Sequence, residues 1–270
     1  MKVDSYAQGT PCWVELGTSD QEAAKAFYSE LFGWSYADHP MDEHGHDHYS
    51  MANRDGLNIA AIYTHHEGMR MADTPPHRDI ILSVEDVDAT AARAAGLGGA
   101  VVEQPQNVGG SGRIAVVADP TGGAVGLWQA GAHIGAQLQH EHGTIGWCEL
   151  LTTDPEAAIR FYTGLLNVES ETADMPDGNR YTVYMSGEIP LAGTMAMPEE
   201  VRRMNIPPHW SVYFQVDSVD ETVAKASALA ATIAMQPMDI PSVGRLGFVL
   251  DPQGAGFGLL TPESDWAESG

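Results

Sequence analysis

The sequence predicts an α+β fold in which a βαβββ unit occurs four times, as a tandem duplication of paired units. Three observations predict it: an internal repeat, a helical apolar pattern after a short strand in each half, and evenly spaced turn signals. The chain has 270 residues, enough for two domains, and its 43% hydrophobic content provides a real core.

The two halves of the chain repeat one another. Residues 9–34 read GTPCWVELGTSDQEAAKAFYSELFGW, and residues 143–168 read GTIGWCELLTTDPEAAIRFYTGLLNV. The match resumes at two Pro-Pro-His sequences and ends at two Asp-Pro-x-Gly sequences. We therefore predict a first domain over 1–130, a linker over 131–142, a second domain over 143–262 and an acidic tail over 263–270.

Each half begins with a strand and a helix. WVELGT and WCELLT predict short strands, and apolar residues at helical spacing follow each of them. Ser19 with Glu22, and Thr153 with Glu156, are typical of capping boxes, and Pro155 suits a first helical turn.

Each half continues with strands and a second helix. Asp55-Gly56 and Ser186-Gly187 are turn signals inside two hairpins. After Pro-Pro, DIILSV and SVYFQV predict strands, VDATAARAAGLGG and VDETVAKASALAA predict helices, and more strands follow up to the Asp-Pro turns.

The charge balance disfavours two classes of partner. Lys and Arg number 13 against 37 Asp and Glu, a net charge of -24, which would repel nucleic acid and anionic membranes. No apolar run has the length of a membrane span, and the first residues lack the pattern of a signal peptide. We expect a cytoplasmic monomer or homodimer with a small-molecule ligand, and buried free thiols at Cys12 and Cys148.

The order of motifs resembles that of the glyoxalase / bleomycin-resistance / extradiol-dioxygenase superfamily, also called vicinal oxygen chelate. The residues that carry the resemblance are the Ser/Thr-Asp-x-Glu-Ala-Ala-x-x-Phe-Tyr helix and the Asp-Pro-x-Gly endings, over residues 9–262. The chain looks most like tandem glyoxalase-like proteins of actinobacteria that are labelled hydroxylases. The resemblance implies two domains with curved sheets around cavities, each cavity suited to a small molecule and often to a divalent metal.

The resemblance also implies where such a metal would be held. The ligand positions of the family fall on Trp13, Trp147, Gly126, Gly258, Asp79 and Ser211. A divalent metal needs three or four converging N or O donors, which these residues do not supply. We therefore expect no cofactor and disfavour glyoxalase I chemistry and extradiol ring cleavage.

Two glutamates are the main catalytic candidates. If Trp13 and Trp147 point inward, strand alternation places Glu15 and Glu149 on the same cavity faces. A carboxyl group between aromatic walls has a raised pKa and suits general acid–base catalysis. The structural alternative is that each glutamate pairs with a buried polar neighbour, such as the arginine of the Gly-Arg sequences.

Histidines and aromatic residues complete the candidate sites. His77 and His209 follow Pro-Pro at a strand entrance, where each could shuttle a proton or bond a loop carbonyl that fixes the turn. The expected substrate-binding residues are Trp13, Trp147, Trp128, Tyr49 and Tyr181.

A histidine-rich run, HPMDEHGHDHYS, occurs in the first half only. His44, His46 and His48 would share one face of an extended segment and could hold Zn²⁺, Ni²⁺ or Cu²⁺. The alternative is a solvated hairpin loop.

Three functions fit these observations. The preferred one is a metal-independent enzyme of lyase, cyclase or isomerase type that acts on an aromatic or polyketide-like metabolite. The second is a binding protein that sequesters a drug without chemistry, as bleomycin-resistance members of the superfamily do. The third is a metal-dependent enzyme that uses the histidine-rich loop.

Overall fold

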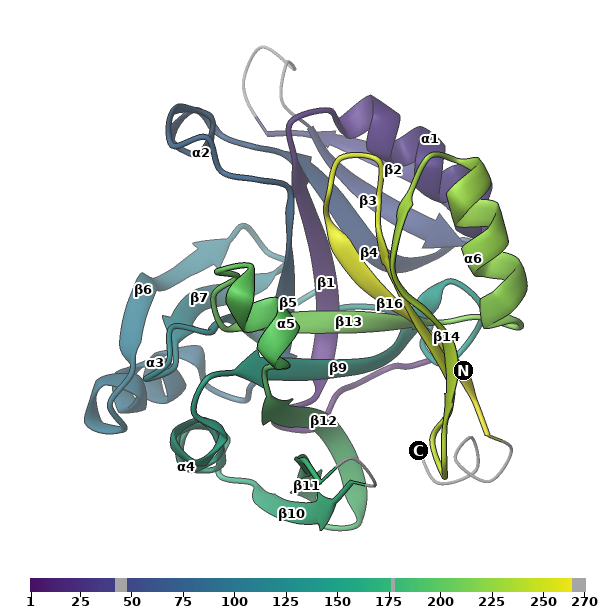
Figure 1. The fold of residues 1–270 in the computed structure, drawn as a ribbon. Helices are drawn as coiled ribbons and strands as arrows, with labels where there is room; N and C mark the ends of the chain where they lie inside the picture. Colours follow the sequence, from purple (N-terminus) through teal and green to yellow (C-terminus); the bar gives the residue numbers. More distant parts are fainter. Residues whose placement is uncertain (42–47, 176–177, 264–270) are drawn as a thin grey trace.

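The computed structural model describes residues 1–41, 48–175 and 178–263, and within them the strands form two eight-stranded mixed sheets (Figure 1). Each sheet is curved and is built from one half of the chain. Its two βαβββ units meet along a central antiparallel pair, β1 with β5 or β9 with β13. The units therefore pair within each half, a point that the repeat alone left open.

The first sheet has the order β2-β3-β4-β1-β5-β8-β7-β6. Its strands are β1 (Pro11–Thr18), β2 (Ser35–Pro40), β3 (His48–Arg54), β4 (Leu57–Thr64), β5 (His77–Ser83), β6 (Ala100–Val108), β7 (Gly112–Ala118) and β8 (Ala124–Ala130). The second sheet has the same order. Its strands are β9 (Thr144–Thr152), β10 (Glu169–Asp174), β11 (Arg180–Ser186), β12 (Ile189–Ala196), β13 (His209–Gln215), β14 (Thr232–Ile240), β15 (Gly244–Leu250) and β16 (Gly256–Pro262).

The four longer helices are α1 (Gln21–Phe32), α3 (Val87–Gly96), α4 (Pro155–Leu166) and α6 (Val219–Ala228). Two short helices, α2 (Glu67–Met71) and α5 (Glu199–Arg203), precede β5 and β13. The predicted capping residues of α1 and α4 were wrong by one position. Asp20 and Asp154 are the N-caps, and each carboxylate accepts the N–H three residues later at 3.0 Å.

The helices pack across the boundary between the halves, α1 against α6 and α3 against α4 (Figure 1). A buried aromatic cluster lies between them. Its members come from both halves: Tyr28, Phe32, Trp34, Phe214 and Phe257. One hydrophobic core therefore runs through the whole chain, and neither half buries its helices alone.

Arg78 lies among the aromatic rings at this boundary. Its guanidinium carbon lies 5.1–5.4 Å from the ring centroids of Tyr28, Phe214 and Phe257, and its Nε donates to the Gly256 carbonyl at 3.0 Å. It also donates to the Tyr28 hydroxyl, which in turn donates to Asp251 at 2.7 Å. The polar chain from Arg78 to Asp251 thus joins the first half to the second.

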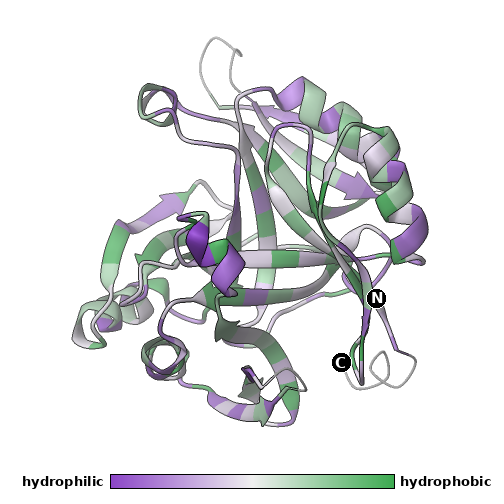
Figure 2. Ribbon diagram, in the orientation of Figure 1, coloured by the Kyte–Doolittle hydropathy of each residue, from purple (hydrophilic) through white to green (hydrophobic). Residues whose placement is uncertain are grey.

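Apolar residues run along the strands, and the hydrophilic colour gathers on α5 (Figure 2). Between the halves, residues 131–142 run between β8 and β9; Ala136 and Leu138 in this segment are buried. No helix in the described part of the chain has the length and apolar character needed to span a membrane.

Candidate functional site

Glu15 lies in a small polar cluster on the inner face of the first sheet. Alternation along β1 places Trp13, Glu15 and Gly17 on one face. Tyr49 of β3 donates its hydroxyl hydrogen bond to Glu15 Oε1, and Trp13 Nε1 donates to the Tyr49 hydroxyl at 2.8 Å. The structure therefore brings together three residues that the sequence predicted for one site.

The second half repeats this arrangement around Glu149. Trp147 Nε1 donates to the Tyr181 hydroxyl at 2.7 Å, and Tyr181 donates to Glu149 Oε2 at 3.0 Å. Here a further tyrosine, Tyr213 of β13, donates to Glu149 Oε1 at 2.8 Å. Both carboxyl oxygens of Glu149 are therefore hydrogen-bonded inside the protein.

The two glutamates differ in exposure. Glu149 is buried, at 7% exposure, whereas Glu15 is half-buried. Burial raises the pKa of both carboxyl groups, and that of Glu15 reaches about 7, with smaller upward contributions from the charges of Asp79 and Glu103. Glu15 is thus the more exposed of the two carboxyl groups.

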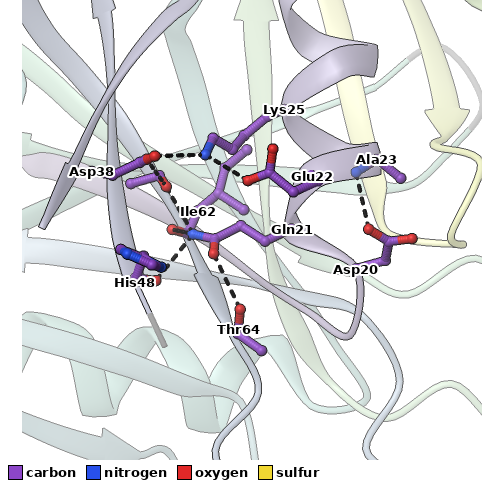
Figure 3. Close-up of polar contacts among 10 residues, drawn as sticks. Asp20, Gln21, Glu22, Ala23, Lys25, Asp38, His48, Ile62 and Thr64 are labelled. Atoms are coloured by element: carbon purple, nitrogen blue, oxygen red, sulfur yellow. Dashed lines mark hydrogen bonds and ion pairs between the residues drawn. The ribbon is translucent and has the colours of Figure 1, made fainter. Parts of the chain in front are cut away.

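The strands that carry the first site are fixed from behind by Gln21 (Figure 3). Its amide nitrogen donates to the Ile62 carbonyl at 2.7 Å and the His48 carbonyl at 3.0 Å, and its oxygen accepts from Thr64 at 3.1 Å. These bonds hold the first turn of α1 to β3 and β4. Tyr49 follows His48 in β3, and Tyr63 lies between Ile62 and Thr64 in β4. The bonds of Gln21 therefore restrict the movement of the strand segments that carry both tyrosines.

His77 and His209 occupy equivalent positions at the starts of β5 and β13. In each, Nδ1 lies within hydrogen-bond distance of the first Pro-Pro carbonyl, at 3.0 Å from Pro75 and 2.8 Å from Pro207. Each histidine therefore makes the contact with a loop carbonyl that the structural alternative describes.

His77 has further partners. Its Nε2 lies 3.2 Å from the Tyr63 hydroxyl and 3.7 Å from Asp79 Oδ2. Asp79 pairs in register with Glu15 across β1 and β5. His77 lies close to Asp79 and therefore belongs to the same cluster as Glu15.

His133, which the sequence analysis did not single out, packs against both Trp13 and Trp128. The His133 ring meets both indoles edge-on, with centroids 4.7 Å from Trp13 and 5.9 Å from Trp128. Trp128 is buried and donates from Nε1 to the His133 carbonyl at 2.8 Å. These rings pack against one another beside Glu15 and Tyr49.

Two further expectations have different outcomes. The arginines of the Gly-Arg sequences do not pair with the glutamates: Arg113 binds Asp88 and Arg245 binds Asp220 at the surface. His44 and His46 lie outside the described residues. His48 is described, and its carbonyl accepts from Gln21.

A pocket of about 800 Å³ opens in the second half between β12 and α5. Met195 and Met197 line it together with Arg202 and Arg203, and Met195 pairs with Tyr181 across the strands. The lining does not include Glu149. The pocket therefore lies next to the second cluster without exposing its carboxyl group.

Comparison with known proteins agrees with this geometry. The model of the Glyoxalase/Bleomycin resistance protein/Dioxygenase superfamily matches residues 11–127 and 144–259. The chain belongs to this superfamily.

Relatives within the superfamily align with nearly the whole chain. The "Putative glyoxylase CFP32" of Mycobacterium tuberculosis is 43% identical, covering 97% of this chain and 98% of its own. The "Anthracycline biosynthesis protein DnrV" of Streptomyces peucetius is 34% identical, covering 94% of each. A Mn(II)-bound glyoxalase from Novosphingobium aromaticivorans shares the fold at a TM-score of 0.64 and 17% identity, covering 95% of this chain and 83% of that one. These similarities support an enzyme-like role on a small molecule.

The metal-ligand positions of the superfamily do not fit a metal in this chain. A Cβ added to Gly258 would lie 2.1 Å from the Tyr213 ring, and one added to Gly126 would lie 2.8 Å from Ile81, so these side chains fill the space of the ligand. Two further positions hold Trp13 and Trp147, whose indoles are poor donors to metals, and the last two hold Asp79 and Ser211, which leaves Asp79 as the one carboxylate of the set. No three His, Cys, Asp or Glu residues converge as a metal site in the described part of the chain.

Sequence reasoning missed Tyr63, Tyr213 and His133 as members of the two clusters. The signal for Tyr213 was available: in SVYFQV, Ser211 and Tyr213 share a face, and Ser211 lies opposite Glu149 once β13 pairs with β9. His133 lies in the segment between the halves, where no periodic pattern assigns a face.

We predict that Glu15→Gln makes the protein more stable than wild type at pH 8 and little different at pH 5. The pKa of Glu15 is raised from 4.5 to about 7 in the folded protein, so folding favours the protonated form. The stability that Glu15 contributes at low pH is lost as pH rises through about 7, whereas glutamine stays neutral. Urea denaturation at both pH values checks this. The exposed Glu169→Gln is the control, and an equal difference at both pH values would contradict the prediction.

Proposed function

We propose that this protein is a metal-independent enzyme that transfers protons on a small aromatic metabolite, with Glu15 as the general base. The observation that carries the proposal is the Glu15 carboxyl group, half-buried beside Trp13, with a pKa raised to about 7. Such a group is a stronger base than an ordinary carboxylate, and about half of it is deprotonated at pH 7.

The surroundings of Glu15 suit a flat, apolar substrate. Trp13 and Trp128 provide an aromatic wall, and the similarity to a protein named for anthracycline biosynthesis supports a polycyclic aromatic compound as the substrate class. Tyr49 holds Oε1 of Glu15, which leaves Oε2 to accept the proton. Removal of a proton next to a ketone begins isomerisation, cyclisation and elimination alike.

Glu149 has a different role in this proposal. Its two oxygens accept hydrogen bonds from Tyr181 and Tyr213, and it is buried. We assign it to packing of the second half because a substrate cannot approach the carboxyl group without displacing a tyrosine.

The proposal is tested by hydrogen exchange at carbon. Chelator-treated protein is incubated in D₂O with enolisable aromatic ketones, from 1-tetralone to tetracyclic anthracyclinones, and deuterium incorporation is measured by mass spectrometry. We expect one of these ketones to gain deuterium next to its carbonyl faster than in buffer. A ketone that binds tightly and returns unlabelled would instead support a sequestering protein, the alternative from the bleomycin-resistance members.

A further inference from the structure

The first half contains a hydrogen-bonded group that the second half lacks. Tyr63 on β4 and His77 on β5 lie on opposite sides of β1, and both pair in register with Gly17. Their side chains meet over this glycine, with the Tyr63 hydroxyl 3.2 Å from His77 Nε2. A Cβ on Gly17 would lie 2.7 Å from the Tyr63 hydroxyl oxygen and 2.9 Å from His77 Cε1. Only glycine leaves room for this contact.

The hydrogen bonds fix the tautomer of His77. A carbonyl oxygen can only accept, so the 3.0 Å contact with Pro75 places a proton on Nδ1. In the neutral ring, Nε2 therefore carries the lone pair. Tyr63 donates its one hydroxyl hydrogen to Asp79 Oδ2 at 2.8 Å, so its oxygen accepts from Nε2 when that nitrogen carries a proton, and the Asp79 carboxylate lies 3.7 Å from Nε2. His65 stacks on the ring of His77 at 5.3 Å and limits its rotation.

The second half has the same histidine without its partners. His209 bonds the Pro207 carbonyl as His77 bonds Pro75. Leu151, however, stands where Gly17 stands in the first half. It pairs in register with Met195 of β12 and His209 of β13, as Gly17 pairs with Tyr63 of β4 and His77 of β5. The repeat places Met195 where Tyr63 stands and Ser211 where Asp79 stands. The second half therefore lacks the tyrosine and the aspartate, and it also lacks the glycine that leaves room for them in the first half.

We propose that Tyr63, His77 and Asp79 form a proton-donating triad in the first half, assembled over Gly17, with His77 as the general acid. In this triad Asp79 and Tyr63 are positioning residues. The triad rests on the proposed function for its reaction: Glu15 takes a proton from a substrate carbon while Nε2 of His77 gives its proton to the substrate oxygen. The enol forms, Glu15 then releases its proton to water, and neutral His77, whose side chain is 29% exposed, takes a proton from water, so both groups return to their starting states.

The assembly of the triad is tested without a substrate by nitrogen-15 NMR of the histidine side chains. We expect the Nδ1–H tautomer at His77 in alkaline solution, and we expect Tyr63→Phe to change the Nε2 chemical shift of His77 while leaving that of His209 in place. Gly17→Ala should change the same signal. Tyr184→Phe is the matched control, because the Tyr184 hydroxyl has no hydrogen-bond partner in the described residues. An Nε2–H tautomer, or a His77 signal unchanged by Tyr63→Phe, would overturn the proposal.

The catalytic role is tested by the exchange assay. We expect Tyr63→Phe and Asp79→Asn to lower turnover by about tenfold to 10²-fold and to shift the alkaline limb of the pH profile, which reports the general acid. The exposed Asp174→Asn is the control for Asp79→Asn. If Glu15→Gln abolishes exchange while both triad variants retain wild-type rates and pH profiles, the triad is wrong and the proposed function stands. If Glu15→Gln retains full activity, the proposed function itself is wrong.

Discussion

Glu15→Gln should lower turnover by about 10²- to 10⁴-fold, the usual contribution of a general base. The glutamine amide keeps the oxygen that Tyr49 bonds, so the side chain stays in place, but it cannot accept a proton. Binding of the aromatic ketone should change little, because Trp13 and Trp128 remain. The measurement is deuterium incorporation at saturating ketone, together with the affinity from fluorescence quenching.

The pH dependence of the wild-type protein gives a second readout of the same group. A base with a pKa of about 7 is active when deprotonated, so kcat/KM should rise with pH through a midpoint near 7, and it should fall again at higher pH, where the general acid loses its proton. The rising limb reports Glu15. The Glu15→Gln variant should lose this limb. The control is Glu169→Gln on the exposed strand β10, which should retain both the rate and the profile. A wild-type profile that is flat between pH 5 and 9 would contradict the assignment.

Arg78→Leu should lower the free energy of unfolding by about 2–4 kcal/mol. The leucine removes the hydrogen bonds to Gly256 and Tyr28 and the contacts with three aromatic rings. It also leaves the Tyr28–Asp251 bond without its cation, in the buried space between the halves. Chemical denaturation followed by tryptophan fluorescence measures the loss.

The matched control for Arg78→Leu is Arg160→Leu on α4. Arg160 is 71% exposed and makes only a surface contact with Glu156 at 3.9 Å, so its replacement should cost less than about 1 kcal/mol. Equal losses for the two variants would show that the polar chain from Arg78 to Asp251 contributes nothing to stability.

The repeat and the alternation of apolar residues were enough to predict the order of strands and helices in each half, and the resemblance to the superfamily implied the curved sheets. A period of two in WVELGT and of 3.6 in the following helix describes local structure, and the duplication supplied each pattern twice. The exact caps were harder, because Ser19 and Asp20 are both good capping residues and only the backbone geometry at Asp20 decides between them.

The candidate site was predictable along the strand and not across the sheet. Trp13 and Glu15 share a face of one strand, which spacing alone reveals. Tyr63 and Asp79 come from two other strands, and their contact depends on the registers of β4 and β5 against β1. Register is set by the packing of all strands together, so no local pattern reports it. The aligned repeat shows Leu151 at the position of Gly17. That this position decides whether two side chains can meet over β1 follows only once Tyr63 and His77 are known to pair with Gly17.

The alternation along β5 has a consequence for how the two copies could diverge. His77 and Asp79 lie on the side of β5 where Tyr63 meets them, while Arg78 between them faces the aromatic rings of the second half. In a symmetric dimer of separate single halves, one gene would specify both cavities, and a change at the equivalent of Gly17 would enter both. Fusion into one chain removes that constraint, so Gly17 and Leu151, or Arg78 and Trp210, can be inherited independently. The joined chain thus allows one cavity to specialise while its twin serves as a packing partner.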